Sequence, residues 1–390
     1  MRILLINNAY QQFGSTDEVV CQEEQMLEQH GEIVLMYGRS NLEIANGPLK
    51  ERILLPINSI YSVRTRTEVG RIVSEHRPDV AYVHNFLPLI SPSVYHTLHA
   101  WRIPSVQVLH EFRLLCPNSV FYTRGGPCER CKNGNYLHAV RYRCYRNSYF
   151  ASFVCSAALA INRFAGMLDK ISAFLCLTEF SRQKLLQVGV PAEKLFVRPH
   201  FIDCTQIRPR FGGGGYILYL GRLSEEKGLW TLLRAASRLK DVEFKIAGRG
   251  PLENSLRRLA TEQGLTNVEF VGAKTVREKW DLLCDCLCVV VPSECYETFG
   301  MVVLEAYAAG KPVIGSDLGS LPFVIEDGNS GLLFRCGNAE ELADNARYLI
   351  SDSTARQRMG KHGRRLVETR YSPAEGYKAL MQVFNRVAGG

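Results

Sequence analysis

Two glutamates stand eight positions apart in a segment whose residue types suit the binding of hydroxyl and phosphate groups. Glu297 lies in a short loop after a strand-like run that ends at Pro292, and Glu305 lies in the helix expected to follow. A carboxylate one turn into that helix can accept hydrogen bonds from both hydroxyls of a ribose, and a carboxylate on the loop can accept them from a second polyol. The structural alternative is that Glu297 caps the helix start and Glu305 lies on a solvated face.

The start of this helix is a candidate site for an anion. Phe299, Gly300 and Met301 form its first residues. A helix N-terminus offers N–H groups and the positive end of a dipole, which suit a diphosphate. Gly300 lets a ligand approach the backbone closely, because it has no side chain. Ligands of open α/β sheets bind beyond the carboxyl ends of strands, so this strand, loop and helix predict a diphosphate site.

A parallel sheet wrapped by helices must hold these loops in place. Short runs rich in Val, Ile and Leu alternate with helical patterns such as Asp17–Gln29, as is typical of strands buried on both faces. The expected strands are Arg2–Ile6, Ile33–Tyr37, Val80–His84, Ser105–His110, Phe174–Thr178, Tyr216–Leu220, Val242–Ala247, Val268–Val271, Leu287–Val291 and Pro312–Gly315. The run Gly212–Gly215 predicts a flexible linker. We therefore expect an α/β fold with two doubly wound, Rossmann-like domains, 1–205 and 206–372.

The segment from Pro292 to Ile314 resembles the glutamate-seven-residues-glutamate signature of the GT4 family of retaining glycosyltransferases, which have the GT-B fold. Further stretches that resemble motifs of this family are Gly221–Gly228, Ala247–Leu252, Val271–Lys274, Asp317–Pro322 and Gly328–Gly331. Together they cover nearly all of residues 216–335. The resemblance implies two domains facing across a cleft, with the acceptor in the first, the nucleotide-sugar donor in the second, and a last helix, 373–388, packing back on the first.

The resemblance also implies roles for individual residues. Arg222 and Lys227 would clamp the donor diphosphate, and their charges would balance the leaving group without a catalytic metal. Together with Glu297 and His110 they are the predicted catalytic residues. The predicted donor-binding residues are Gly14, Gly221, Arg249, Lys274, Lys279, Phe299, Gly300, Met301 and Glu305. For Arg249 and Lys279 the alternative is placement on the surface, away from the nucleotide. The donor is a nucleoside-diphosphate sugar, and the acceptor hydroxyl belongs to a glycan, a lipid-linked group or a small polyol.

The implied reaction retains the anomeric configuration of the sugar. The acceptor hydroxyl attacks from the face that the nucleotide leaves, and a phosphate oxygen of the leaving group takes its proton. A carboxylate pair at glycosidase spacing is therefore not required. Glu297 and His110 would hold the sugar in place.

The first half resembles the family more loosely. The run from Phe13 to Asp17 stands where the family has a Gly-Gly turn that opens a helix, and Ser15 replaces the second glycine. Gly14 remains as the candidate phosphate contact. His110 stands at the end of an expected strand, at a position where the family has a histidine that touches the donor sugar. The alternative for His110 is a structural histidine.

Four of the thirteen cysteines form a cluster in the sequence, at Cys116, Cys128, Cys131 and Cys144. A Cys-x2-Cys pair with one cysteine on each side can supply four thiolates to a structural zinc ion or to an iron–sulfur centre. A metal would pin a polar loop that lies close in sequence to His110. The alternative is ordinary reduced thiols or a disulfide.

The basic excess of the chain is local. Lys and Arg number 47 against 39 Asp and Glu, and residues 101–150 alone hold 8 basic and 2 acidic residues. This predicts an anionic partner, either a phosphorylated acceptor or an acidic membrane contacted peripherally through 101–150, and no nucleic acid. The alternative is a solvated basic loop. The candidates to face such a partner are Arg141, Arg143 and Arg146. The segment Tyr149–Leu168 is apolar on nearly all sides, so a buried helix is expected there instead of one on a membrane surface.

No run of about 18 apolar residues and no signal-peptide pattern is seen in the sequence. We therefore expect a cytoplasmic protein, with the inner face of the membrane as its peripheral site.

Other functions are compatible with the same scaffold. A nucleotide-sugar epimerase would need carboxylates poised against the sugar ring, and a phosphorylase would need a phosphate or pyridoxal site that the sequence does not show. A non-catalytic nucleotide-sugar-binding protein is opposed by the intact set of Arg222, Lys227, Glu297 and Glu305. The sequence therefore predicts a metal-independent, retaining glycosyltransferase.

Overall fold

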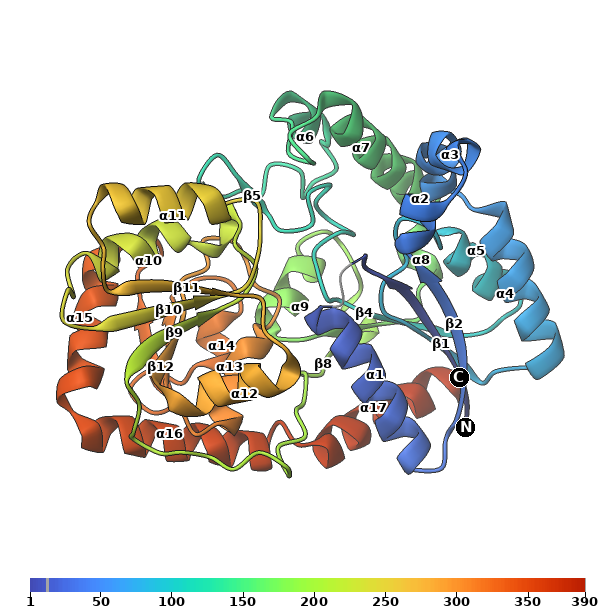
Figure 1. Ribbon diagram of the computed structural model, residues 1–390. Helices are drawn as coiled ribbons and strands as arrows, with labels where there is room; N and C mark the ends of the chain where they lie inside the picture. Colours follow the sequence, from blue (N-terminus) through green and yellow to red (C-terminus); the bar gives the residue numbers. More distant parts are fainter. Residues whose placement is uncertain (12–13, 390) are drawn as a thin grey trace. The chain divides into compact units, whose positions relative to one another are not determined.

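The computed structural model describes residues 1–11 and 14–389, which form two compact units (Figure 1). Unit 1 consists of residues 1–120, 129–199 and 376 onward, and unit 2 consists of residues 121–128 and 200–375. The chain therefore enters unit 2 early, through the segment Phe121–Cys128, and returns to unit 1 in its last helix, α17 (Pro373–Ala388).

Unit 1 contains a six-stranded parallel sheet in the order β2-β1-β3-β4-β7-β8. Its strands are β1 (Arg2–Ala9), β2 (Ile33–Ser40), β3 (Val80–Val83), β4 (Ser105–Val108), β7 (Ala173–Cys176) and β8 (Leu195–Val197). Its helices are α1 (Ser15–Gln29), α2 (Leu42–Asn46), α3 (Leu49–Ile60), α4 (Val63–His76), α5 (Ser93–Ala100), α6 (Leu137–Arg141), α7 (Tyr149–Phe164), α8 (Met167–Lys170), α9 (Glu179–Leu186), η1 (Ala192–Lys194) and α17. Strands β3, β4 and β7 are buried at every position, because helices cover the sheet.

Unit 2 contains a second six-stranded parallel sheet, in the order β11-β10-β9-β12-β13-β14. Its strands are β9 (Tyr216–Leu220), β10 (Glu243–Ala247), β11 (Val268–Gly272), β12 (Cys286–Val291), β13 (Val313–Ser316) and β14 (Gly331–Phe334), and a hairpin of β5 (Tyr122–Thr123) and β6 (Gly126–Pro127) belongs to the same unit. Its helices are η2 (Glu225–Lys227), α10 (Leu229–Ala236), α11 (Glu253–Glu262), α12 (Val276–Asp285), α13 (Met301–Ala308), α14 (Leu321–Val324), α15 (Ala339–Ser351) and α16 (Ser353–Glu368). The predicted α/β architecture of two parallel sheets is confirmed.

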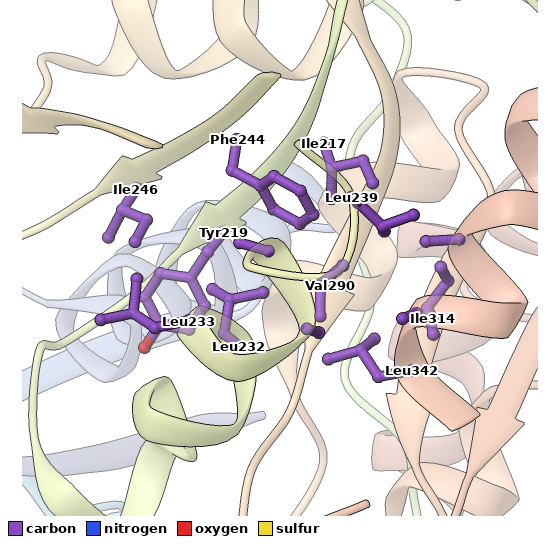
Figure 2. Packing of buried hydrophobic residues seen from close by; sticks show 14 of the residues in the cluster. Ile217, Tyr219, Leu232, Leu233, Leu239, Phe244, Ile246, Val290, Ile314 and Leu342 are labelled. Atoms are coloured by element: carbon purple, nitrogen blue, oxygen red, sulfur yellow. The ribbon is translucent and has the colours of Figure 1, made fainter. Parts of the chain in front are cut away.

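An apolar core holds the central strands of unit 2 against their covering helices (Figure 2). Ile217 and Tyr219 of β9 pack with Leu232 and Leu233 of α10, and all four side chains are almost fully buried. Tyr219 also donates its hydroxyl to the backbone oxygen of Arg222, at 2.8 Å. The core therefore fixes the loop that leaves β9, because one of its own side chains holds that loop.

The glycine run between the two sets of strands is packed, so the prediction of a flexible linker is wrong. A Cβ on Gly214 would lie 2.3 Å from the backbone carbon of Cys286, and Gly214 has a φ of +145°. The buried Lys311 donates to the oxygen of Gly213 at 2.7 Å, and Arg356 donates to the oxygen of Gly212 at 3.1 Å. Glycine is needed here for close approach of the backbone to β12 and not for mobility.

The helix predicted to be buried, Tyr149–Leu168, is also different in the structure. It divides into α7 and α8, and α7 exposes Tyr149, Phe150, Phe153, Ile161 and Phe164. The prediction was wrong because three of the four buried residues of α7, Ser152, Ser156 and Asn162, are polar, which leaves large apolar residues on the outer face. None of the helices described is long and apolar enough to cross a membrane.

Candidate active site

The strand order of unit 2 creates a switch point between β9 and β12. From β9 the chain moves outward in one direction through β10 and β11, and from β12 it moves outward in the other direction through β13 and β14. The loops that follow β9 and β12 therefore diverge from adjacent strand ends, which is where open α/β sheets bind ligands. These loops are 221–228 and 292–300, and they carry the strongest motifs of the sequence.

The loops at this edge are locked together by direct backbone contacts. A Cβ on Gly228, whose φ is +68°, would lie 1.8 Å from the oxygen of Pro292. A Cβ on Gly248, whose φ is +138°, would lie 1.9 Å from the oxygen of Gly221. Only glycine fits either position, so the loops after β9, β10 and β12 form one rigid platform.

Lys227 and Glu297 meet on this platform. Nζ of Lys227 donates to Oε1 of Glu297 at 2.6 Å, and the hydroxyl of Ser293 donates to the same oxygen at 2.5 Å. Ser293 is itself held, because its backbone oxygen accepts a hydrogen bond from Ser316 on β13 at 2.6 Å. The Lys227 and Glu297 side chains are 27% and 15% exposed, so the pair is largely withdrawn from water and still reachable by a ligand.

The charges of this pair stabilise each other. Burial on its own lowers the pKa of Lys227, but the Glu297 carboxylate together with Cys295 and Tyr219 outweighs burial and raises that pKa above its ordinary value. Burial raises the pKa of Glu297, but the Lys227 ammonium and the hydrogen bond from Ser293 outweigh it, so the net pKa is lowered. Both groups are therefore charged at neutral pH.

A second ion pair joins α12 to α13. Nζ of Lys279 donates to Oε1 of the buried Glu305 at 2.9 Å. Glu305 lies in the second turn of α13, and Gly300, with a φ of +89°, precedes the first residue of that helix. The structure therefore joins two predicted donor-binding residues, Lys279 and Glu305, that were assigned separately from the sequence.

The side chain of Phe299 does not face a ligand site. It is 2% exposed, and its ring makes edge contacts with His200 at 5.3 Å and Tyr371 at 5.9 Å between centroids. Phe299 thus anchors the start of α13 in the interior, and only its backbone is left for a donor. Met301, the first residue of α13, is partly exposed.

The remaining basic candidates of unit 2 follow three successive strands. Arg222 comes after β9, Arg249 after β10 and Lys274 after β11. Parallel strands end at one edge of a sheet, so these cations line the same edge. Arg222 and Arg249 are exposed, and Nζ of Lys274 lies 3.7 Å from Oε1 of Glu278. This edge therefore offers the exposed guanidinium groups of Arg222 and Arg249 to an anionic ligand, beside acidic residues of the same loops.

The predicted His110 of unit 1 is paired with a second histidine that the sequence reasoning missed. Nδ1 of His84 and Nε2 of His110 are 2.8 Å apart, and the two rings stack with their centroids 5.0 Å apart. His84 follows β3 and His110 follows β4, so the neighbouring strand ends bring them together. The sequence places each histidine at the end of a strand-like run, but it does not show that the two strands are neighbours.

Burial lowers the pKa of His110 to about 4, and the opposing effect of the Glu111 carboxylate does not offset it. The imidazole is therefore neutral at pH 7, and it can accept one hydrogen bond and donate another. Glu111 forms an ion pair with Arg113 beside it. The two histidines, Glu111 and Arg113 line a small pocket at this edge of unit 1.

Gly14 is the residue before α1, and its backbone is extended with a φ of −137°. Its N–H donates to Oδ2 of Asp17 at 3.3 Å, which closes the start of the helix. Nothing in this conformation requires glycine. Phe13, the first residue of the predicted turn motif, lies outside the residues that the structure describes.

The four-cysteine metal site receives no support. Among residues 1–11 and 14–389, no group of three or more His, Cys, Asp or Glu side chains is placed to hold a metal ion. Cys131 and Cys144 pack instead in a small apolar cluster with Tyr136, and Cys128 belongs to unit 2 while the other three cysteines belong to unit 1. Sequence spacing could not foresee that the chain changes units between Cys116 and Cys131.

The hairpin in this segment also contributes to the site region of unit 2. The ring of Phe121 contacts that of Tyr296, with 5.9 Å between centroids, and Tyr296 is the neighbour of Glu297. No sequence motif indicated this contact.

Comparison with protein families gives two adjoining matches. The family described as "Glycosyltransferase Family 4" matches residues 18–206, and the family described as "Glycosyl transferases group 1" matches residues 205–366. Their boundary falls close to the point where the chain leaves unit 1 for unit 2.

Curated relatives carry the names of glycosyltransferases. The chain is 28% identical over 237 residues to α-D-kanosaminyltransferase of Streptomyces kanamyceticus, a match that covers 56% of this chain and 61% of that protein. It is 32% identical over 201 residues to phosphatidyl-myo-inositol mannosyltransferase of Mycobacterium leprae, covering 48% and 52% of the two chains. The matched parts span between 43% and 61% of the lengths of the first few relatives.

Solved structures share the whole fold. HepE of Anabaena in complex with UDP aligns with a TM-score of 0.69 at 19% identity, over 99% of this chain and all of that one. Sucrose-phosphate synthase of Thermosynechococcus elongatus aligns with a TM-score of 0.72 at 18% identity, over 99% and 98% of the two chains.

Proposed function

Because the chain belongs to the GT4-type family of GT-B glycosyltransferases, we propose that unit 2 binds a nucleoside-diphosphate sugar and that unit 1 binds the acceptor whose hydroxyl receives the sugar. The observation that carries this proposal is the Lys227–Glu297 pair at the switch point of the unit 2 sheet. A cation suits the donor diphosphate, and a fixed carboxylate suits the hydroxyls of the sugar.

The proposed reaction proceeds with retention and without a catalytic metal. Lys227 and Arg222 stabilise the negative charge that develops on the departing diphosphate, and the N-terminus of α13 at Gly300 adds its dipole. Lys227 is suited to this role because its raised pKa keeps it charged. The acceptor hydroxyl attacks from the face that the nucleotide leaves, and its proton passes to a phosphate oxygen of the leaving group.

Glu305 and Lys279 form the proposed ribose subsite. The Glu305 carboxylate is buried and oriented by Lys279, so its remaining lone pairs have a defined direction in which to accept the two ribose hydroxyls. Arg249 and Lys274, which follow neighbouring strands at the same edge of the sheet, are proposed to lie near the nucleotide. The role of His110 toward the donor sugar and that of Gly14 toward a phosphate stay predictions.

The proposal gives the chemical class of the donor, a nucleoside-diphosphate sugar, and does not specify the base or the sugar. HepE was crystallised with UDP and with UDP-glucose, which makes a uridine diphosphate sugar the first donor to test. Guanosine and adenosine diphosphate sugars complete the set. The basic region 101–150 supports an anionic acceptor, and the name of one relative, a phosphatidyl-myo-inositol mannosyltransferase, makes a lipid-linked acceptor the first class to test.

Calorimetry combined with product analysis tests the proposal. Each nucleoside diphosphate and its sugar is titrated into the protein, and the products formed with and without acceptor are identified by mass spectrometry. The proposal expects one nucleotide to bind and the sugar to be transferred. Interconversion of the donor without transfer would identify an epimerase, and binding without any turnover would identify a binding protein.

A further inference from the structure

Helix α7 has polar residues on its buried face and apolar residues on its exposed face, the opposite of an ordinary surface helix. Its buried positions are Ser152, Ser156, Leu159 and Asn162, three of which are polar. Their polar groups are matched with backbone partners: Ser156 donates to the oxygen of Tyr136 at 3.2 Å, and Ser152 accepts from the N–H of Tyr145 at 3.0 Å. The inner face of α7 is thus attached by hydrogen bonds more than by apolar packing.

The outer face of the same helix is apolar. Tyr149, Phe150, Phe153, Ile161 and Phe164 recur at the spacing of one helix face and are all exposed, Phe150 to 70% and Phe164 to 96%. Single exposed apolar residues are common on soluble proteins and need no explanation. Five on one face of one helix form a contiguous patch, which marks a surface for an apolar partner.

Helix α3 enlarges this patch. It packs against α7 (Figure 1), and Nδ2 of Asn162 donates to the oxygen of Ile60 at the end of α3, at 3.2 Å. None of the α3 residues is buried, and its exposed apolar side chains are Leu49, Ile53, Leu54 and Ile57. The docking face is defined here as the exposed apolar residues of α7 and of α3.

One end of the docking face is strongly basic. Residues 130–168 contain six Lys and Arg and no Asp or Glu. Arg141, Arg143 and Arg146 are exposed just before α7 begins, and the guanidinium of Arg143 lies 5.5 Å from the centre of the Tyr149 ring. Cations at a helix N-terminus are unfavourable on their own, because they meet the positive end of the dipole, so an external anion at this end would be attracted.

We propose that the docking face seats the protein on an anionic bilayer, with the aromatic side chains of α7 at the boundary between headgroups and acyl chains. A bilayer supplies both an apolar layer and negative headgroups, which match the face and its basic end. Arginine stems can lie along the apolar layer while their guanidinium groups reach phosphate. A second copy of the chain fits less well, because it would cover the apolar residues but would offer no acidic side chain from residues 130–168 to the arginines.

Flotation of the full-length protein with vesicles tests the inference, and it requires no donor, so it is independent of the proposed glycosyl transfer. One vesicle set is phosphatidylcholine alone and the other contains added phosphatidylglycerol. The first variant is Phe150→Ser with Phe153→Ser and Phe164→Ser, and the second is Arg141→Gln with Arg143→Gln and Arg146→Gln. The matched control, Arg66→Gln with Arg71→Gln and Arg102→Gln, removes the same charge from exposed positions elsewhere in unit 1.

Wild type and the control are expected to float with anionic vesicles and to bind phosphatidylcholine more weakly. Loss of the three arginines should lower binding to anionic vesicles by roughly 100-fold, since each basic residue near such a surface adds about 5-fold. Loss of the three phenylalanines should abolish flotation with both vesicle types. Since these side chains are exposed, the melting temperature should not change.

A Phe153→Trp variant provides a measurement that does not depend on a multiple substitution. Its added fluorescence should be quenched by lipids with brominated acyl chains, whereas the native protein, with its three tryptophans, should show no such quenching. No flotation of wild type, unchanged flotation of the phenylalanine variant, or absence of quenching at residue 153 would overturn the inference. A dimer that the phenylalanine variant abolishes would assign the face to a second copy instead.

Discussion

Replacement of Lys227 by alanine tests whether its ammonium stabilises the departing diphosphate. Nζ of Lys227 is held 2.6 Å from Oε1 of Glu297, on a platform that glycine contacts make rigid. The group is therefore already in position and needs no rearrangement when charge develops on the leaving group. Loss of one such preorganised group costs about 2.7–4 kcal/mol of transition-state stabilisation, and we expect kcat to fall by roughly 10²–10³-fold.

The same substitution leaves Glu297 largely buried with Ser293 as a remaining partner. Its pKa, now lowered, should rise, because burial would no longer be opposed by the ammonium. In the wild type this carboxyl contributes stability above its unfolded pKa, and that stability is lost as the pH falls through the lower folded pKa. The variant should lose this contribution, and urea unfolding at pH 7 should show a loss of about 1–2 kcal/mol, since the pair is partly exposed.

Two controls separate catalysis from stability. Lys227→Arg keeps the charge and should retain more activity than Lys227→Ala. Lys240→Ala removes an exposed lysine of the same unit and should change neither activity nor unfolding. Initial rates at saturating and limiting donor give kcat and kcat/KM. If Lys227→Ala keeps the wild-type kcat while the protein stays folded, the assignment of Lys227 to the leaving group is refuted.

Three further predictions concern the same machinery. Glu305→Gln should weaken binding of the bare nucleoside diphosphate in calorimetry, whereas Glu297→Ala should lower turnover more than nucleotide affinity, and the opposite pattern would reverse the two assignments. Activity should survive EDTA if Arg222 and Lys227 balance the diphosphate charge, and a loss that magnesium or manganese restores would contradict this. Because the pKa of His110 is lowered from 6.5 to about 4, protonation favours the unfolded chain, so stability should decline as the pH falls from about 6.5 to about 4. Urea unfolding of His110→Gln should show a weaker decline, and an unchanged pH dependence would contradict the assignment.

The fold was predictable because parallel strands that are buried on both faces appear in the sequence as short, continuous apolar runs. The runs at Arg2–Ile6 and Tyr216–Leu220 are rich in large apolar residues, and the structure places strands there. Strand ends were less accurate, as at Ser105–His110, where β4 ends at Val108. The chain after β4 turns away to bring His110 beside His84, a tertiary contact that no local pattern encodes.

The sequence named candidate site residues, but it did not predict which of them contact one another. Lys227 and Glu297 were assigned to different parts of the donor, and only the strand order brings their loops together. Phe299 was placed among donor-binding residues because it adjoins Gly300, whereas packing against His200 and Tyr371 turns its ring inward. The side chains of neighbouring residues point in different directions. A sequence motif therefore cannot show which of its side chains face the ligand.

The errors in α7 and in the glycine run have a common origin. Composition predicted burial for α7 and mobility for Gly212–Gly215, and both properties depend on what lies against the segment. Serine and asparagine side chains on the buried face of α7 form hydrogen bonds with backbone groups. Their polarity alone would have predicted an exposed face. Glycine at Gly214 admits the backbone of Cys286, and composition cannot distinguish this close contact from flexibility.

Proton NMR of the sugar released from an α-linked nucleoside-diphosphate sugar tests the central claim most directly. The experiment follows the first turnovers of the wild-type protein, before the free sugar mutarotates, and repeats them with Glu297→Ala and Lys227→Ala. A retaining transferase whose site lies at the Lys227–Glu297 pair should release the α-anomer first, and both variants should release sugar far more slowly. Initial release of the β-anomer, or release by either variant at the wild-type rate, would contradict the account.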